Sequence, residues 1–356
     1  MAKTEEGVSC VMETESFFNQ AEIEQELERV GFESPKVFQK EHAKLIVMIP
    51  AYNEEDSIGM VIKEIPREIA GVDEVRILVM DDGSTDNTSQ VAYMAGADHV
   101  LSQKANRGLA FTFKLGLETA LKLGADIIVN TDADFQYDQK EVPQLIRPVL
   151  EHKADIVLGN RQVHELDHMA FGKKYGNLLG SFVMRKLTGC SVSDTQTGFR
   201  AFSREAALRI NILSPYTYTQ ETIIQAVNKK LVVAEIPCTF RKRKAGSSKL
   251  ISGIMNYISR VALTIIRTYT MYKPLKVFVA IGSVLTLTGA AFGIRFLVFY
   301  LANEGTGHIQ SLILAAVLIV VGFQTVITGL IADVVDANRK INEELLYRVK
   351  KREFEK

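Results

Sequence analysis

The residues with the clearest chemical potential are Asp132 and Asp134, which lie shortly after the apolar run Ile127-Ile128-Val129. Two carboxylates separated by one residue, at the carboxyl end of a buried strand, project into the crevice where open α/β sheets bind ligands. Both acids can reach one hard cation, and oxygen ligands of this type suit Mg²⁺ or Mn²⁺ shared with a diphosphate. The pattern therefore predicts a metal-assisted diphosphate site at a strand end.

Two earlier apolar runs also end in polar clusters. Leu45–Ile49 leads into Pro50-Ala51-Tyr52-Asn53-Glu54-Glu55, and Val75–Met80 leads into Asp81-Asp82-Gly83-Ser84-Thr85-Asp86. Each cluster alone is equally typical of a helix-capping turn, because Asp, Ser and Thr favour N-caps. Three clusters at three strand ends favour one shared ligand crevice.

These clusters have a chemical interpretation as a nucleotide-sugar site. Asp82 can accept hydrogen bonds from a base edge or from ribose hydroxyls, Tyr52 can pack on the base or sugar, and Glu54 can hold a polar edge. Gly83 allows the tight turn and close backbone approach that such a loop needs.

Strands and helices alternate along this part of the chain. Further strands are expected at His99–Leu101, Asp126–Asn130 and Asp155–Leu158, with a helix over Leu109–Leu123. The alternation predicts a parallel sheet of right-handed βαβ units. No G-x-G-x-x-G follows the first strand and no P-loop motif occurs, which disfavours a dinucleotide-dependent dehydrogenase or a P-loop ATPase.

Composition excludes other classes of protein. The chain has 356 residues with 42 basic and 42 acidic side chains, so no overall charge attracts nucleic acid. Cys10, Cys190 and Cys238 fit neither a disulfide framework nor a C-x-x-C metal site and indicate a reducing compartment. Residues 1–43 are expected to form a partly helical or disordered extension with no assignable function.

Two apolar stretches near the C-terminus, Leu275–Leu301 and Ile309–Ile331, are each long enough to cross a bilayer. They predict a transmembrane hairpin over residues 274–335, followed by a charged tail over 336–356. The short link 302–308 lacks Lys and Arg, whereas both outer flanks are basic, so the positive-inside rule places the catalytic domain and both termini in the cytoplasm. Residues 250–273 have the composition of an amphipathic helix in the membrane interface.

Together, the motifs at Pro50–Glu55, Asp81–Asp86 and Asp132–Gln136 resemble the inverting family 2 glycosyltransferases. Within them, the chain most resembles the dolichyl-phosphate mannose synthase and polyprenyl-phosphate hexosyltransferase group. The resemblance implies an α/β nucleotide-diphospho-sugar transferase domain, Rossmann-like and of the GT-A type, over residues 44–249. It also implies Mg²⁺ or Mn²⁺ held by Asp132, Asp134 and Gln136.

The same resemblance distributes roles over further residues. Nucleotide-sugar binding is expected at Pro50, Tyr52, Glu54, Met80, Asp82, Asp132, Ala133, Arg243 and Lys249. The acceptor phosphate is expected at Arg161, Lys174, Asn177 and Arg200, and the catalytic residues are expected to be Asp134 and Asp194.

Two segments carry the acceptor side of the resemblance. Residues 194–200 resemble a D-x-x-[ST]-G-[FY]-R signature, and residues 243–249 fit an R-x-x-G-x-S-K pattern. Arg and Lys suit diphosphate binding under a closing loop, although such a basic run beside a membrane can also hold anionic lipid headgroups. A polyprenyl phosphate is largely dianionic at neutral pH and needs no strong general base. Asp194 is therefore expected to orient the acceptor or a basic partner, and a proton-accepting role for it stays open.

Several alternatives remain at this stage. A processive polysaccharide synthase is disfavoured, because the chain has no tryptophan for a Q-x-x-R-W motif and only two convincing spans. Transfer to a hydroxyl acceptor and a non-catalytic nucleotide-sugar-binding membrane scaffold both stay open. So do the donor, among GDP-mannose, UDP-glucose and UDP-N-acetylglucosamine, and assembly as a homo-oligomer.

Overall fold

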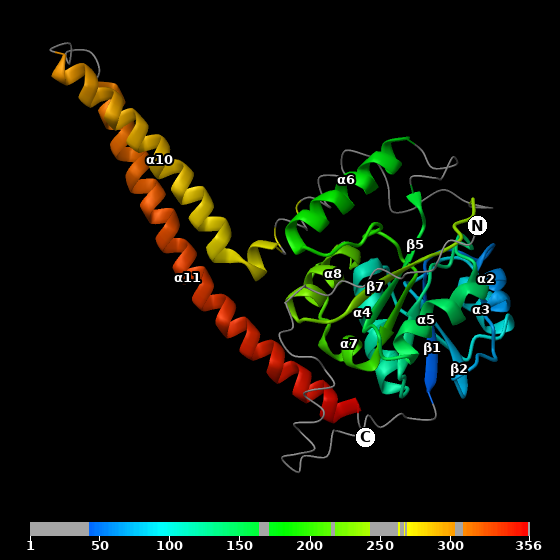
Figure 1. Cartoon of the computed structure of the whole chain (residues 1–356). Helices are drawn as coiled ribbons and strands as arrows, with labels where there is room; N and C mark the ends of the chain where they lie inside the picture. The colour runs from blue at the N-terminus through cyan, green and yellow to red at the C-terminus, as the bar shows by residue number, and fades with distance from the viewer. Residues whose placement is uncertain are drawn as a thin grey trace, which may run out of the picture. The chain divides into compact units, whose positions relative to one another are not determined.

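The computed structural model describes residues 43–163, 171–214, 218–242, 263, 267, 269–302 and 309–354 (Figure 1). The chain divides into two compact units, residues 1–264 with 353–356, and residues 265–352. Each unit is considered by itself. The predicted extension over 1–43, the basic stretch 243–249 and nearly all of the predicted interfacial helix over 250–273 lie outside the described residues.

The first unit is built on a seven-stranded sheet within the described residues, with the order β3-β2-β1-β4-β6-β5-β7. Its strands are β1 (Lys44–Ala51), β2 (Glu74–Asp81), β3 (His99–Ser102), β4 (Ile127–Asn130), β5 (Ile156–Asn160), β6 (Arg200–Ser203) and β7 (Val233–Pro237). Strands β1 to β4 pair in parallel, and β5 pairs with β7 in parallel.

Helices cover both faces of this sheet. On one face α2 (Ile58–Glu64), α3 (Thr88–Met94) and α5 (Val142–Leu150) share an apolar core with alternate residues of β1. On the other face α4 (Leu109–Lys122) lies so close to the sheet that a Cβ on Gly116 would collide with the Met48 side chain. The remaining elements are η1 (Gln139–Glu141), α6 (Phe171–Thr188), α7 (Arg204–Arg209) and α8 (Thr219–Asn228).

The sheet is mixed rather than parallel, so the prediction of an all-parallel sheet is wrong for one strand. β6 runs antiparallel to both of its neighbours, with Arg200 opposite Asn130 of β4 and opposite Leu158 of β5. The residues that precede β6 therefore lie at the same edge as the residues that follow β4 and β5. This reversal brings distant parts of the sequence together at one edge.

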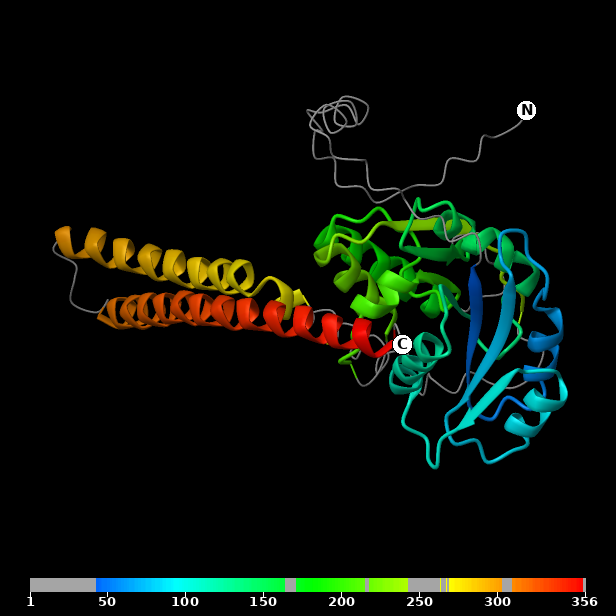
Figure 2. The same cartoon turned by 90° about the horizontal axis from the view of Figure 1, so that it is seen from below.

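The second unit is a pair of long helices, α10 (Pro274–Leu301) and α11 (Ile309–Phe354), which run side by side in both views (Figures 1 and 2). Both are long and apolar enough to cross a membrane. Helix α11 continues without a break through the charged residues predicted as a tail after 335.

Glycines allow α10 and α11 to approach at backbone distance. A Cβ on Gly282 would lie 2.7 Å from the carbonyl oxygen of Gly322, and one on Gly289 would lie 2.9 Å from that of Ala315. Small residues of this kind let membrane helices pack where lipid gives no hydrophobic driving force. The hairpin is therefore specified by a complementary surface and not by hydrophobicity alone.

Replacement of Gly282 by alanine is expected to weaken the hairpin, because the new Cβ would also lie 2.6 Å from the Val326 side chain. Overpacking of this kind costs about 1–3 kcal/mol. Gly293→Ala is the matched control, since its Cβ would meet only the Ala315 Cβ at 3.7 Å. Helix loss during titration with SDS, followed by circular dichroism, should come earlier for Gly282→Ala alone; equal midpoints for the two variants would contradict the packing.

Candidate active site

The loops after β1 and β2 hold each other in place. The Asn53 amide N–H donates to Ser84 Oγ at 2.9 Å, and Asn53 Oδ1 accepts from the Thr85 N–H at 2.8 Å. The Glu54 N–H donates to Thr88 Oγ1 at 2.8 Å. Asn53 has a φ of 52°, a left-handed conformation that asparagine tolerates. The two predicted polar clusters thus form one cross-linked rim.

Asp82 fixes a third loop against this rim. Its buried carboxylate accepts hydrogen bonds from the backbone N–H groups of Arg107 at 2.8 Å and Gly108 at 2.9 Å, and from Gln103 Nε2 at 3.2 Å. Gly83 has a φ of 73°, and a Cβ there would lie 2.6 Å from the Ala105 carbonyl carbon. The carboxylate predicted to bind a nucleotide therefore also shapes the loop that opens α4.

The other predicted nucleotide residues divide by burial. Tyr52 and Glu54 are half-buried at the strand end, where Glu54 accepts a hydrogen bond from Ser57 Oγ at 3.0 Å. Pro50 is buried and lies opposite Met80 in the β1–β2 ladder. The Met80 side chain is 0% exposed and packs toward α4, and a contact between Met80 and the nucleotide-sugar stays a prediction.

The predicted metal ligands lie on a strained turn after β4. Asp132, Asp134 and Gln136 are half-buried, and Ala133 between the two acids is buried. Phe135 has a φ of 61°, which is an outlier for a bulky residue and is characteristic of functional sites. The Gln136 N–H donates to Asp134 Oδ1 at 3.2 Å, which holds the turn closed. The strain is concentrated between the residues expected to bind the metal.

Gln136 connects this turn to the segment after β7. Its Nε2 donates to the Arg241 carbonyl at 3.2 Å, and its own carbonyl accepts from the Arg241 N–H at 2.7 Å. Because the amide nitrogen is used in this way, Oε1 lies on the opposite side of the amide and suits a cation. Arg241 is in turn paired with Glu64 at 2.9 Å and Asp138 at 2.6 Å, and the hydrogen bond that it donates to Glu64 raises the pKa of the guanidinium.

The segment that precedes β6 packs directly on the turn formed by residues 132–136. This turn carries the predicted metal ligands and is called the metal turn below. Gly198 donates its N–H to Tyr137 Oη at 3.0 Å, and its carbonyl accepts from Asn130 Nδ2 at 2.7 Å. A Cβ on Gly198 would lie 2.6 Å from Asp132 Oδ1. Burial raises the pKa of the Tyr137 hydroxyl, so it stays protonated. Glycine is required here because the Asp132 carboxylate lies against the backbone.

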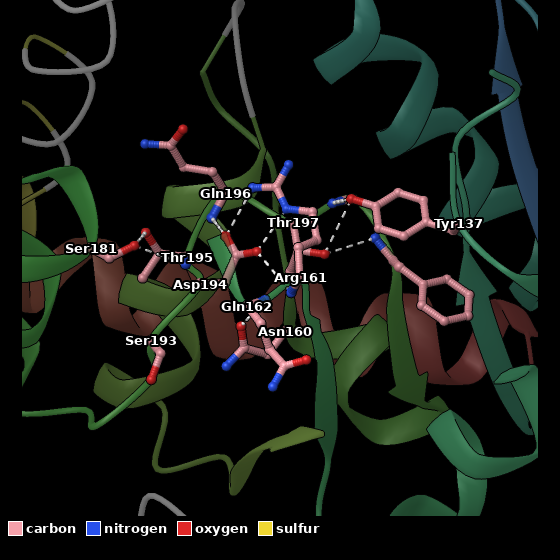
Figure 3. A network of polar contacts seen from close by, with 12 residues as sticks. Tyr137, Asn160, Arg161, Gln162, Ser181, Ser193, Asp194, Thr195, Gln196 and Thr197 are labelled. Carbon is pink, nitrogen blue, oxygen red and sulfur yellow. Dashed lines mark hydrogen bonds and ion pairs between the residues drawn. The ribbon is translucent and has the colours of Figure 1, made fainter. Parts of the chain in front are cut away.

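Arg161 and Asp194 form a bidentate ion pair at the same edge (Figure 3). Arg161 Nε lies 2.7 Å from Asp194 Oδ2, and Nη2 lies 2.9 Å from Oδ1. The side chains are only 11% and 1% exposed, respectively. Burial alone would raise the pKa of Asp194, but the charge and hydrogen bonds of Arg161 outweigh it and lower that pKa. Asp194 is therefore held as a carboxylate, which makes it a weak proton acceptor.

Helix α6 borders this pair. Asn177 is buried on α6, and Ser181 Oγ lies 3.1 Å from Thr195 Oγ1 and accepts from the Thr195 N–H at 3.2 Å (Figure 3). The side chain of Lys174, on the same helix, and both Arg243 and Lys249 lie outside the described part of the chain.

Arg200, predicted to bind the acceptor phosphate, lies inside the core. Its side chain is 0% exposed and donates to the carbonyl oxygens of Thr195, Thr197 and Thr219 at 2.8–2.9 Å. These bonds fix the turn that carries Asp194 and Gly198. Binding of the acceptor phosphate by Arg200 stays a prediction.

Sequence reasoning missed three residues that organise the site. Asn130 and Tyr137 hold Gly198 from two sides, and Glu235 of β7 accepts from the Asp194 N–H at 2.8 Å. Tyr137 follows the metal turn by one residue, a spacing that could have identified it. Nothing in the sequence links Glu235 to Asp194, because the contact crosses 41 residues.

Comparisons with known proteins agree with this geometry. Residues 46–210 match the model of glycosyl transferase family 2. The UDP-N-acetylglucosamine–dolichyl-phosphate N-acetylglucosaminyltransferase of Methanococcus voltae is 32% identical over 219 residues, covering 54% of this chain and 84% of the relative. The dolichyl-phosphate hexose transferase of Haloferax volcanii is 31% identical over 208 residues, covering 58% and 86%.

A relative from Photorhabdus laumondii extends the likeness further along the chain. The undecaprenyl-phosphate 4-deoxy-4-formamido-L-arabinose transferase is 27% identical over 319 residues, covering 82% of this chain and 88% of the relative. Among solved structures, the glucosyl-3-phosphoglycerate synthase of Mycobacterium tuberculosis in complex with UDP is 22% identical, covers 65% of this chain and 80% of its own, and has a TM-score of 0.50. That likeness concerns the fold.

The chain belongs to glycosyl transferase family 2, with the mixed sheet of a GT-A fold and two apolar C-terminal helices. It is a membrane-associated glycosyltransferase, and it falls in the dolichyl-phosphate hexosyltransferase group of that family.

Asp194→Asn is expected to destabilise the first unit by about 3–5 kcal/mol at neutral pH, because it leaves the buried Arg161 charge without its partner. The pKa of Asp194 is lowered from about 3.8, so its contribution is present above that pH and is lost as the pH falls through the lower folded value. The difference between wild type and variant should therefore shrink in acid. Cys190 and Cys238 are buried, so a thiol-reactive dye in a Cys10→Ser background reports this unfolding.

The control is Glu151→Gln. Like Asp194, Glu151 is paired with cations, in this case Arg147 and Lys153. All three of these side chains lie on the surface, where ion pairs contribute little. A similar loss of stability in both variants would contradict a special role for the buried pair.

Proposed function

We propose that this protein transfers a hexose from a nucleotide-diphospho-sugar to a polyprenyl phosphate, such as dolichyl phosphate, held in a membrane. The observation that carries the proposal is the convergence of Asp132, Asp134 and the Arg161–Asp194 pair at one edge of the sheet, in a chain with two membrane-length helices. The names of the relatives, which act on dolichyl or undecaprenyl phosphates, agree with it.

A divalent cation fits the turn after β4. Asp132, Asp134 and Gln136 would hold Mg²⁺ or Mn²⁺ through two carboxylates and an amide oxygen, and diphosphate oxygens would complete the coordination. Among the described residues no group of three or more His, Cys, Asp or Glu is arranged to hold a metal ion. When bound, the cation would neutralise charge on the departing nucleoside diphosphate.

The proposal places the acceptor phosphate beside the Nη1 group of Arg161. Asp194 engages the Nε–Nη2 edge of the guanidinium, so the Nη1 edge of the same planar group points away from Asp194. A guanidinium held in one orientation by a carboxylate can align a phosphate for in-line attack at the anomeric carbon. Because the phosphate dianion is already nucleophilic, Asp194 contributes by orienting Arg161 and not by accepting a proton. The family resemblance implies inversion at the anomeric carbon.

The basic stretch 243–249 suits the nucleotide diphosphate. Arg241, two residues earlier in the sequence, is hydrogen-bonded to Gln136 through both of its backbone groups. This supports the assignment of Arg243 and Lys249 to donor binding. The basic flanks of the apolar helices support a cytoplasmic catalytic domain with both termini on the same side.

Gly198→Ala is expected to reduce affinity for Mn²⁺, because its Cβ would lie 2.6 Å from Asp132 Oδ1 and would displace that carboxylate. A loss of at least about tenfold is expected, since ligand placement controls metal affinity. Titration of free Mn²⁺ by electron paramagnetic resonance, with and without UDP or GDP, measures it. Gly59→Ala on α2 is the control, because its Cβ would press only on the Val91 side chain at 3.3 Å, away from the turn after β4. It should bind Mn²⁺ as wild type does; unchanged affinity in Gly198→Ala would argue against Asp132 as a ligand.

The function is tested by lipid-phase transfer. Membranes that contain the protein would receive a polyprenyl phosphate with labelled GDP-mannose, UDP-glucose or UDP-N-acetylglucosamine, and Mg²⁺ or Mn²⁺. Label should enter the organic phase from one donor and be lost with EDTA or in Asp134→Asn, by at least about a hundredfold in rate, since metal and leaving group act together. Label that appears only in water-soluble products would favour a hydroxyl acceptor instead.

A further inference from the structure

Glu235 is a charged, half-buried residue on β7 that the proposed chemistry does not use. Its Oε1 accepts from the Asp194 N–H at 2.8 Å and from the Ser193 N–H at 3.1 Å, while Oε2 accepts from the Ser193 N–H at 3.0 Å. One carboxylate therefore satisfies two consecutive backbone donors of the segment that carries Asp194.

The position of Glu235 in the sheet makes this contact rigid. Glu235 lies opposite Leu158 of β5 in a parallel ladder, and β5 leads directly to Arg161. The strand that holds Glu235 is thus hydrogen-bonded to the strand that presents Arg161. Glu235 accepts a hydrogen bond from the Asp194 backbone, so β7 holds Asp194 while the neighbouring strand β5 leads to Arg161. The two partners of the ion pair are therefore held by two adjacent, hydrogen-bonded strands.

A carboxylate is an unfavourable group with which to cap the backbone at this position. Burial raises the pKa of Glu235, and the hydrogen bonds from Asp194 and Ser193 offset this only in part. The half-buried Glu235 also adds a like charge close to the buried Asp194 carboxylate. Perturbed groups of this kind concentrate at functional sites.

We propose that Glu235 is a positioning residue for the acceptor. It holds the Ser193–Asp194 backbone so that the Asp194 carboxylate orients Arg161 toward the acceptor phosphate. The inference rests on the proposed function and assigns Glu235 to acceptor binding rather than to donor or metal binding.

The test compares apparent KM values for the two substrates in the full-length protein in membranes. Glu235→Ala should raise KM for the polyprenyl phosphate by about tenfold or more, because misplacement by about 1 Å is costly. KM for the nucleotide-sugar and affinity for Mn²⁺ should change by less than about twofold. Glu235→Gln should restore the acceptor KM, since its amide oxygen can still accept from both N–H groups.

Glu141→Ala is the matched control. Glu141 also caps a nearby backbone group, accepting from the Thr239 N–H at 2.9 Å and from Thr239 Oγ1 at 2.6 Å, but it does not hold the Asp194 segment. Its removal should leave the acceptor KM unchanged. Equal effects of Glu141→Ala and Glu235→Ala, or an effect of Glu235→Ala on both substrates, would overturn the inference.

Two further readouts separate the possible failures. If Glu235→Ala does not fold by the thiol-dye assay, Glu235→Asp decides, because its shorter side chain keeps the charge and cannot reach both amides. A raised acceptor KM in Glu235→Asp with rescue in Glu235→Gln supports the inference, and a wild-type value in Glu235→Asp overturns it. Absence of lipid-linked product from the wild-type protein would instead overturn the proposed function, on which the inference depends.

Discussion

The antiparallel course of β6 is the constraint on which the rest of the site depends. In a wholly parallel sheet, only residues that follow strands would reach the carboxyl edge. Because β6 runs the other way between β4 and β5, the residues before it reach that edge as well. Gly198 then meets the Asp132 carboxylate, and Asp194 meets Arg161. The turn after β4 and the Arg161–Asp194 pair are thus brought together by the reversed direction of β6.

The two arginines near this strand show how burial separates structural from functional charge. Arg200 is buried and donates hydrogen bonds to carbonyl oxygens. Arg161 instead donates two hydrogen bonds to the Asp194 carboxylate along one edge of its guanidinium. A buried ion pair is weak evidence for stability, because desolvation opposes the attraction between the charges. The presence of the Arg161–Asp194 pair beside the metal turn is better explained by the orientation that Asp194 imposes on Arg161.

Much of the frame could be predicted from the sequence, because apolar strands with polar ends and two long apolar stretches have simple patterns. β6 could not, since it has only four residues, starts with an arginine and is separated from α6 by the irregular segment 189–199. The burial of Met80 and Arg200 could not be predicted for a related reason. A motif fixes the place of a residue along the chain, but its burial depends on what packs against it. The contact of Glu235 with Ser193 and Asp194 could not be predicted, because these partners are distant from it in the sequence.

Backbone strain and hydrogen bonding both indicate that the loops of this site are rigid. Three residues other than glycine with positive φ, namely Asn53, Phe135 and Gln162, follow the ends of β1, β4 and β5. Such conformations cost about 1–3 kcal/mol each and persist only where neighbouring bonds enforce them. Bonds at Ser84, Asp134 and Asn160 do so here. A phosphate nucleophile needs little activation, so a rigid, preorganised edge that places reactants is the contribution such chemistry requires of the protein.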